Sequence, residues 1–148
     1  KLETLQQTVR AENIENIAIY PFLHGADFEN ALAISDCALV TLVAGSTGLC
    51  CPSKTYSYMM QGIPLLAVMD EGDIVSDIEA GAGCWVRNGE GERLAEKIRM
   101  LKDSPETVQT MRRVCRSLYE KKYTKEICTA QYVSLFRALL GQEGELST

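Results

Sequence analysis

One short segment of the chain combines the residue types that proteins use to hold phosphate groups. Residues 45–54 read GSTGLCCPSK, with two glycines, three small hydroxyl residues and a lysine. Gly45 and Gly48 allow the backbone to approach a ligand closely and to take positive φ. Lys54 adds an ammonium group near the start of a helix, where unpaired N–H groups favour an anion. The segment predicts an anion-binding loop; the alternative is an ordinary turn in which Ser53 only caps the helix.

The elements around this loop follow from short apolar runs that alternate with amphipathic stretches. We expect strands at 17–22, 37–43, 64–69 and 84–87, and helices at 26–35, 52–61, 72–81, 91–103, 105–123 and 124–141. The runs at 37–43 and 64–69 are almost continuously apolar, which is typical of strands buried on both faces of a parallel sheet. The alternation predicts an α/β fold, a Rossmann-like parallel sheet with flanking helices. Ligands of such sheets bind beyond the carboxyl ends of the strands, where the glycine-rich loop lies.

Composition limits the classes of protein to which the chain can belong. Its 148 residues, 46% of them hydrophobic, are enough for one domain with a core. The net charge of -5 argues against a nucleic-acid partner, because a surface that follows phosphates must be basic. No apolar run approaches the roughly 20 residues that span a bilayer, so we expect a soluble protein. Residues 1–141 are expected to form the domain and 142–148 a flexible tail.

Several other side chains could do chemistry. None of the six cysteines forms a C-x-x-C pair, and we interpret them as buried, reduced thiols of a cytosolic protein, with a reactive thiol at Cys50 or Cys51 left open. His24 follows a predicted strand and could touch a ligand or lie exposed in a loop. An acidic cluster could attract a metal, although acidic residues before a helix commonly serve its N-terminus, so no metal site is predicted. That cluster comprises Asp70, Glu71 and Asp73.

The chain resembles the C-terminal, donor-binding domain of GT-B glycosyltransferases, most closely the retaining family-4 enzymes that build bacterial surface polysaccharides. The most specific matching block is PSKTYSYMMQGIPLLA at 52–67, followed by GAGCWV at 81–86 and the helices after it, up to about residue 140. The resemblance implies a fragment of a two-domain enzyme whose N-terminal acceptor domain is missing, so the fragment should be inactive alone. No catalytic residue is assigned within this chain.

The resemblance also implies which residues bind the nucleotide diphospho-sugar, of UDP or GDP type, with no other cofactor. Phe22 and Leu23 would flank the base. Residues at the loop and the following turn would contact the diphosphate and the sugar: Ser46, Thr47, Gly48, Leu49, Pro52, Ser53 and Lys54. Many family members carry two glutamates at the positions of Leu49 and Ser57. Because a serine cannot act as a bidentate acceptor, Ser57 would bind ribose more weakly, shared with a neighbour such as Tyr56.

The implied function is transfer of a sugar, with retained configuration, to a bacterial polysaccharide or a lipid-linked acceptor. The location would be cytoplasmic, where the full enzyme could associate peripherally with the inner face of the membrane, and the fragment could form a homo-oligomer. Two alternatives stay open: part of a nucleotide-sugar epimerase, and a non-catalytic α/β nucleotide-binding or interaction module. Fold alone does not separate these alternatives.

The resemblance further implies that the first strands of the sheet are missing. The family's domain has six parallel strands in the order 3-2-1-4-5-6, and the four strands expected here would be the third to the sixth. The two strands that separate 17–20 from 37–43 would then be absent, which would expose strand edges. We therefore expect that 17–20 pairs with 37–43 or with a second copy of the chain, or that another segment supplies the missing strands.

Overall fold

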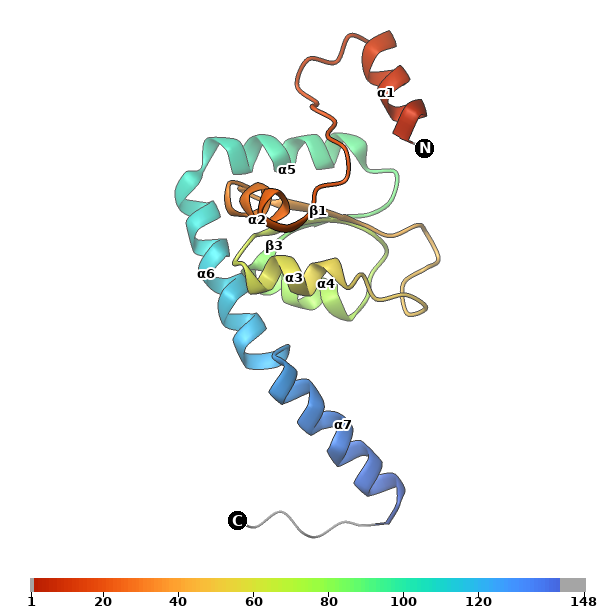
Figure 1. The fold of residues 1–148 in the computed structure, drawn as a ribbon, viewed down its shortest axis with the longest axis vertical. Coiled ribbons are helices and arrows are strands. Elements are labelled where there is room, and N and C mark those ends of the chain that lie inside the picture. Colours follow the sequence, from red (N-terminus) through yellow and green to blue (C-terminus); the bar gives the residue numbers. More distant parts are fainter. Residues whose placement is uncertain (1, 142–148) are drawn as a thin grey trace. The chain divides into compact units, whose positions relative to one another are not determined.

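A computed structural model describes residues 2–141 of the chain. The predicted tail at 142–148 lies outside the described residues. Two compact units, Lys1–Ala33 and Ile34–Thr148, divide the chain, and their positions relative to one another are not determined (Figure 1). The predicted domain of residues 1–141 therefore spans both units.

Within residues 2–33, which the structure describes, the first unit contains helices and no strand. Its helices are α1 (Leu2–Ala11) and α2 (Gly25–Ala33), joined by a segment without regular structure. The predicted strand at 17–22 is wrong: Pro21 lacks a backbone N–H, and Phe22 is 84% exposed. Its predicted pairing with 37–43 is therefore wrong too, while pairing with a second copy or with another segment stays a prediction.

The second unit is built on a parallel sheet of three strands. The strands are β1 (Ala38–Thr41), β2 (Leu65–Val68) and β3 (Gly83–Val86), in the spatial order β1-β2-β3. Leu65 pairs with Ala38 on one side and with Gly83 on the other. Helices flank this sheet, which confirms the predicted Rossmann-like α/β fold (Figure 1).

The helices of the second unit begin and end close to their predicted bounds. They are α3 (Lys54–Met60), α4 (Asp73–Asp77), the π-helical turn η1 (Ile78–Ala82), α5 (Gly91–Asp103), α6 (Pro105–Lys122) and α7 (Lys125–Leu139). The single helix expected at 72–81 divides into α4 and η1, and Gly81 takes a φ of 106° inside η1. Among the helices of residues 2–141, none combines the length and the apolar character needed to cross a membrane.

The core lies on both faces of β2. Leu65 and Ala67 pack on one face with Met59, Ile78 and Cys115, which belong to α3, η1 and α6. On the other face, Leu66 packs with Cys84, Leu101 and Val108 from β3, α5 and α6. The prediction of a strand buried on both faces is therefore confirmed for β2.

The same prediction is wrong for β1, which is an edge strand with one exposed face. Ala38 and Val40 are buried, whereas Leu39 is 57% exposed and Thr41 is also exposed. The apolar run is thus continuous in sequence but buried only at alternate positions.

The cysteines divide into three environments, which corrects the expectation of six buried thiols. Cys84 and Cys115 are buried, Cys37 and Cys128 are half-buried, and the neighbours Cys50 and Cys51 are exposed in the loop after β1. Burial raises the pKa of the Cys115 thiol to about 11, and its Sγ donates to the Ala82 carbonyl at 2.9 Å. Apolar surroundings thus keep Cys115 in its protonated thiol form. The hydrogen bond of this thiol links α6 to η1.

We expect Gly83→Ala to destabilise the fold. An added Cβ would lie 1.9 Å from the Leu65 carbonyl oxygen, so the β2–β3 pair would have to separate. Overpacking of this kind costs about 2–3 kcal/mol of unfolding free energy, which urea denaturation would measure. Gly91→Ala is the matched control, because nothing lies within 4 Å of its added Cβ at the start of α5. Equal midpoints for the two variants would contradict the close strand approach.

Candidate functional site

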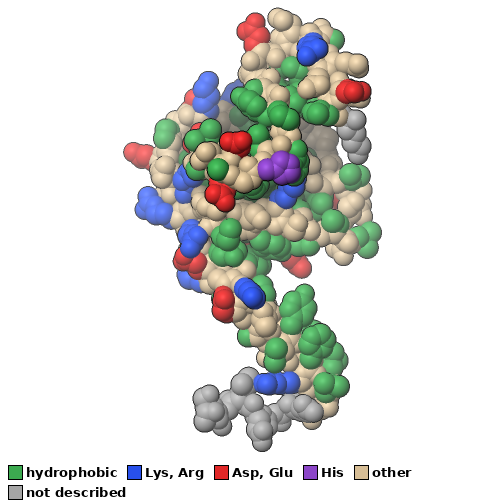
Figure 2. Space-filling model, in the orientation of Figure 1, with side chains coloured by type: hydrophobic (Ala, Val, Ile, Leu, Met, Phe, Trp, Pro, Cys, Tyr) green, Lys and Arg blue, Asp and Glu red, His purple; other side chains and the backbone are tan. Residues whose placement is uncertain are grey.

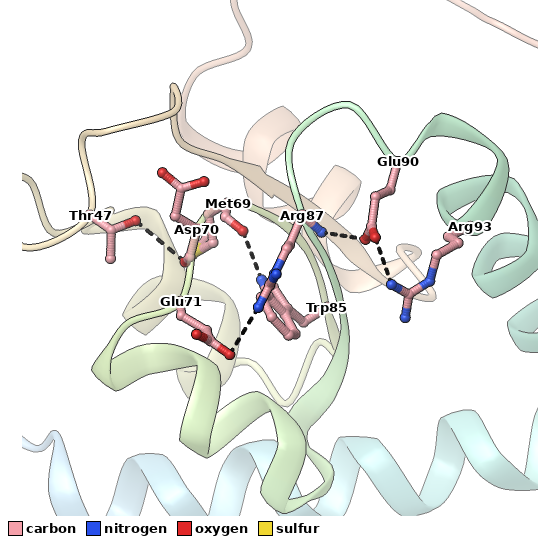
Figure 3. A network of polar contacts seen from close by, with 8 residues as sticks. All are labelled: Thr47, Met69, Asp70, Glu71, Trp85, Arg87, Glu90 and Arg93. Atoms are coloured by element: carbon pink, nitrogen blue, oxygen red, sulfur yellow. Dashed lines mark hydrogen bonds and ion pairs between the residues drawn. The ribbon is translucent and has the colours of Figure 1, made fainter.

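The loops that follow the three strands meet at one edge of the sheet, and Asp70 connects them. The Gly45 N–H donates to Asp70 Oδ2 at 2.7 Å, and the Asn88 side chain donates to Asp70 Oδ1 at 3.5 Å. Thr47 Oγ1 donates to the Asp70 carbonyl at 3.4 Å (Figure 3). Because parallel strands end at the same edge, one carboxylate reaches the loops after β1 and β3. The glycine-rich loop is therefore anchored to both neighbouring strand ends.

A second polar network surrounds β3 at this edge (Figure 3). Trp85 Nε1 donates to the Met69 carbonyl at 2.9 Å, and Arg87 forms an exposed ion pair with Glu71 at 3.2 Å. Glu90 accepts from the Arg87 backbone N–H at 2.8 Å and from Arg93 at 2.7 Å. These bonds hold the pKa of Glu90 below its ordinary value, and the bond from the Arg87 N–H has the larger effect. The network fixes the turn that leads from β3 into α5.

The acidic cluster after β2 is engaged in protein contacts. The Asp70 carboxylate accepts from Gly45 and Asn88, and Glu71 pairs with Arg87. Asp73 begins α4, where a negative charge favours the helix dipole. In the part of the chain that the structure describes, no group of three or more His, Cys, Asp or Glu side chains is placed to hold a metal ion.

Both glycines of the glycine-rich loop take a left-handed backbone conformation. Gly45 and Gly48 take φ values of 78° and 83°, in the region that favours glycine. Ser53 stands at the N-cap position of α3 but makes no capping bond with its side chain, and the alternative of an ordinary turn stays open. The Gly45 N–H already binds Asp70. An anion would therefore bind further along the loop, toward Lys54.

Eight of the ten predicted donor-binding residues lie in one continuous segment, 46–57, comprising Ser46, Thr47, Gly48, Leu49, Pro52, Ser53, Lys54 and Ser57. Leu49 and Lys54 are exposed, and Ser57 is exposed on α3. Phe22 and Leu23 belong to the first unit, so their place beside the base stays a prediction. His24 is exposed, with its ring 4.7 Å from that of Phe22.

No pattern in the sequence predicted the groove that lies beside the loop. This tyrosine groove, about 720 Å³ in volume, lies between α3, α6 and α7 and extends to Cys51 in the loop. Four tyrosines line it: Tyr56, Tyr119, Tyr123 and Tyr132. Tyr119 lies on α6, Tyr123 at the C-terminal end of α6 and Tyr132 on α7. Their convergence with Tyr56 depends on how these helices pack.

A buried carboxylate holds two of the residues that line this groove. Asp77 is 3% exposed and accepts hydrogen bonds from the Tyr123 hydroxyl and the Lys122 ammonium. The Tyr56 hydroxyl lies 3.0 Å from Cys51 Sγ, and the Tyr56 and Tyr123 rings are 4.7 Å apart. Burial raises the pKa of both tyrosines, and these hydrogen bonds raise it further by a smaller amount. Both hydroxyls therefore remain neutral hydrogen-bonding groups at physiological pH.

Comparison with known proteins relates the chain to a probable glycosyltransferase. The chain is similar to a protein of Pseudomonas aeruginosa named "Probable glycosyltransferase WbjE", with 34% identity over 113 residues. The match covers 75% of this chain and 28% of that protein, so the chain spans less than a third of the relative's length. No protein-family model and no solved structure matches the chain. The similarity supports a relationship to glycosyltransferases at this general level.

We expect Asp70→Ala to release the glycine-rich loop from the sheet edge. The variant loses the charge-assisted bond from the Gly45 N–H at 2.7 Å, which is worth about 1–3 kcal/mol. Hydrogen exchange at the Gly45 amide should accelerate, and the unfolding free energy should fall by that amount. Asp103→Ala, at the exposed last residue of α5, is the control and should change neither. Unchanged exchange at Gly45 would show that Asp70 does not hold the loop.

Proposed function

We propose that this chain is the donor-binding part of a retaining glycosyltransferase of the GT-B type. The observation that carries the proposal is the 34% identity to a probable glycosyltransferase over 113 residues. The parallel sheet and the glycine-rich loop at its carboxyl edge add support, because this edge is where such sheets bind ligands. The donor would be a nucleotide diphospho-sugar of UDP or GDP type, with no metal or other cofactor.

The loop offers a specific side for the diphosphate. Asp70 holds the Gly45 N–H and brings a negative charge to that end of the loop. Lys54 stands exposed at the start of α3, whose N-terminus lacks a side-chain cap. The diphosphate would therefore lie across Gly48 and Pro52 to Lys54, away from Asp70. Ser57, one turn further along α3, would reach the ribose hydroxyls.

In the reaction, these groups would stabilise the departing diphosphate. As the bond to the donor sugar breaks, negative charge develops on the leaving oxygen, and the Lys54 ammonium and the α3 N–H groups would compensate it. The reacting end of the acceptor, a polysaccharide or a lipid-linked glycan, would be held by a further domain, in keeping with the 28% of the relative that this chain matches. The complete enzyme would act on the cytoplasmic side, at the inner face of the membrane, and the chain alone would form an inactive monomer or homo-oligomer.

We expect Lys54→Ala to weaken nucleotide binding. Isothermal titration with UDP and with GDP should show an affinity lower by about 1–3 kcal/mol, the usual value of a hydrogen bond to a charged group. Lys102→Ala, in the last turn of α5, is the matched control and should bind as the unmodified chain does. Failure of both nucleotides to bind the unmodified chain would overturn the proposed function, and equal affinity of the Lys54 variant would remove Lys54 from the site.

We expect Ser57→Glu to preserve or raise the affinity for the same nucleotide. A carboxylate can accept hydrogen bonds from both ribose hydroxyls, whereas the serine hydroxyl can bind one well. Because Ser57 is exposed, the melting temperature should change little. Ser57→Ala serves as the comparison and should bind no more tightly than the unmodified chain. Weaker binding by the glutamate variant would place the ribose elsewhere.

A further inference from the structure

We propose that the tyrosine groove between α3, α6 and α7 binds a neutral carbohydrate chain. The choice of carbohydrate rests on the proposed function, because an enzyme that extends a glycan must hold one near the donor. The shape and chemistry of the groove stand independently of that proposal. Its volume of about 720 Å³ falls within the range of small-molecule sites, roughly 300–1,000 Å³.

The walls of the groove are aromatic. Four of the six tyrosines in the chain line it, from α3, from α6 and its C-terminal end, and from α7. A tyrosine ring offers an apolar face to the C–H side of a sugar ring, and its hydroxyl offers a hydrogen bond at the edge. This pairing of apolar faces with polar edges matches the two kinds of surface on a pyranose.

Two of the rings, those of Tyr56 and Tyr123, are held by contacts within the protein. The buried Asp77 carboxylate holds Tyr123, and the Tyr56 hydroxyl contacts Cys51 Sγ at 3.0 Å. Tyr132 stacks against Phe136 on α7, with ring centroids 6.5 Å apart, while 63% of the Tyr132 surface remains exposed. Walls that are already ordered lose little conformational entropy on binding, which favours a weakly interacting ligand such as a sugar.

The charge of the groove favours a neutral ligand. Among the described residues that line it, Lys122 is the charged one, and the Asp77 carboxylate pairs with its ammonium. The other polar side chains are neutral donors and acceptors, the Ser57 hydroxyl and the Gln131 amide. A phosphate or an acidic sugar would meet no unpaired cation in the groove. Sugar hydroxyls, by contrast, can bond to each of these groups.

The groove meets the proposed donor site. Cys51 belongs to the glycine-rich loop and also lines the groove, and Ser57 lines it one turn after Lys54. A glycan in the groove would therefore lie beside a sugar nucleotide held at the loop. This placement fits a chain that is held while a neighbouring sugar is transferred.

A second copy of the chain is the competing occupant. The apolar side of α7 continues beyond the groove through Leu135, Phe136 and Leu139, which are exposed, and Figure 2 shows hydrophobic side chains gathered along this helix. Pairing through α7 would cover the groove with apolar side chains. It would leave the Gln131 amide and the Ser57 hydroxyl without polar partners, which argues for a glycan instead.

An array of neutral and acidic glycans tests the proposal with the whole chain, followed by titration of the best neutral oligosaccharide. We expect a neutral glycan to bind, and Tyr132→Ala to weaken it by about tenfold through loss of one stacking wall. Tyr20→Ala removes an exposed tyrosine of the first unit and is the matched control. Gln131→Ala should also weaken binding, so the conclusion does not depend on the Tyr132 variant alone. Circular dichroism checks that each variant folds.

Two binding results would overturn the proposal: no neutral glycan binds, or the Tyr132 and Gln131 variants bind the glycan as the unmodified chain does. Light scattering that shows a dimer dissolved by Tyr132→Ala would likewise assign the groove to a second copy. Glycan binding that survives while UDP and GDP fail to bind would support the groove and reject the donor site, so the two proposals fail separately.

Discussion

The parallel pairing of β1, β2 and β3 is the constraint on which the rest of the second unit depends. Leu65 and Leu66 point to opposite faces of β2, and each anchors one layer of helices. The pairing needs Gly83 opposite Leu65, because a side chain there would meet the Leu65 backbone. Parallel strands also end at one edge, so three loops from distant parts of the sequence become neighbours.

Asp70 holds together the loops at that shared edge. Its carboxylate joins the loop after β1 to the turn after β3, and it occupies the Gly45 N–H that an anion could otherwise use. The same carboxylate thus orders the loop and restricts where negative charge can bind. The positive end of the loop, at Lys54 and the uncapped start of α3, is left as the complementary position.

Like Asp70, Asp77 is a carboxylate that joins separate elements of the second unit by hydrogen bonds. It is buried at the end of α4, and its partners Lys122 and Tyr123 lie where α6 passes into α7. A buried carboxylate without partners would be costly, so the ion pair and the tyrosine bond hold this junction in one arrangement. The tyrosine groove exists because the junction sets α7 beside α3.

Local patterns in the sequence determined the helices and the central strand. Residues 91–103 form α5 as predicted, and β2 is buried on both faces, because periodicity and apolar content act within one element. Tertiary structure alone decided that 17–22 is not a strand and that Leu39 is exposed, since pairing and burial depend on neighbours. It also decided the tyrosine groove, because Tyr56 and Tyr132 line one groove only when α3 packs on α6 and α7 follows from the end of α6.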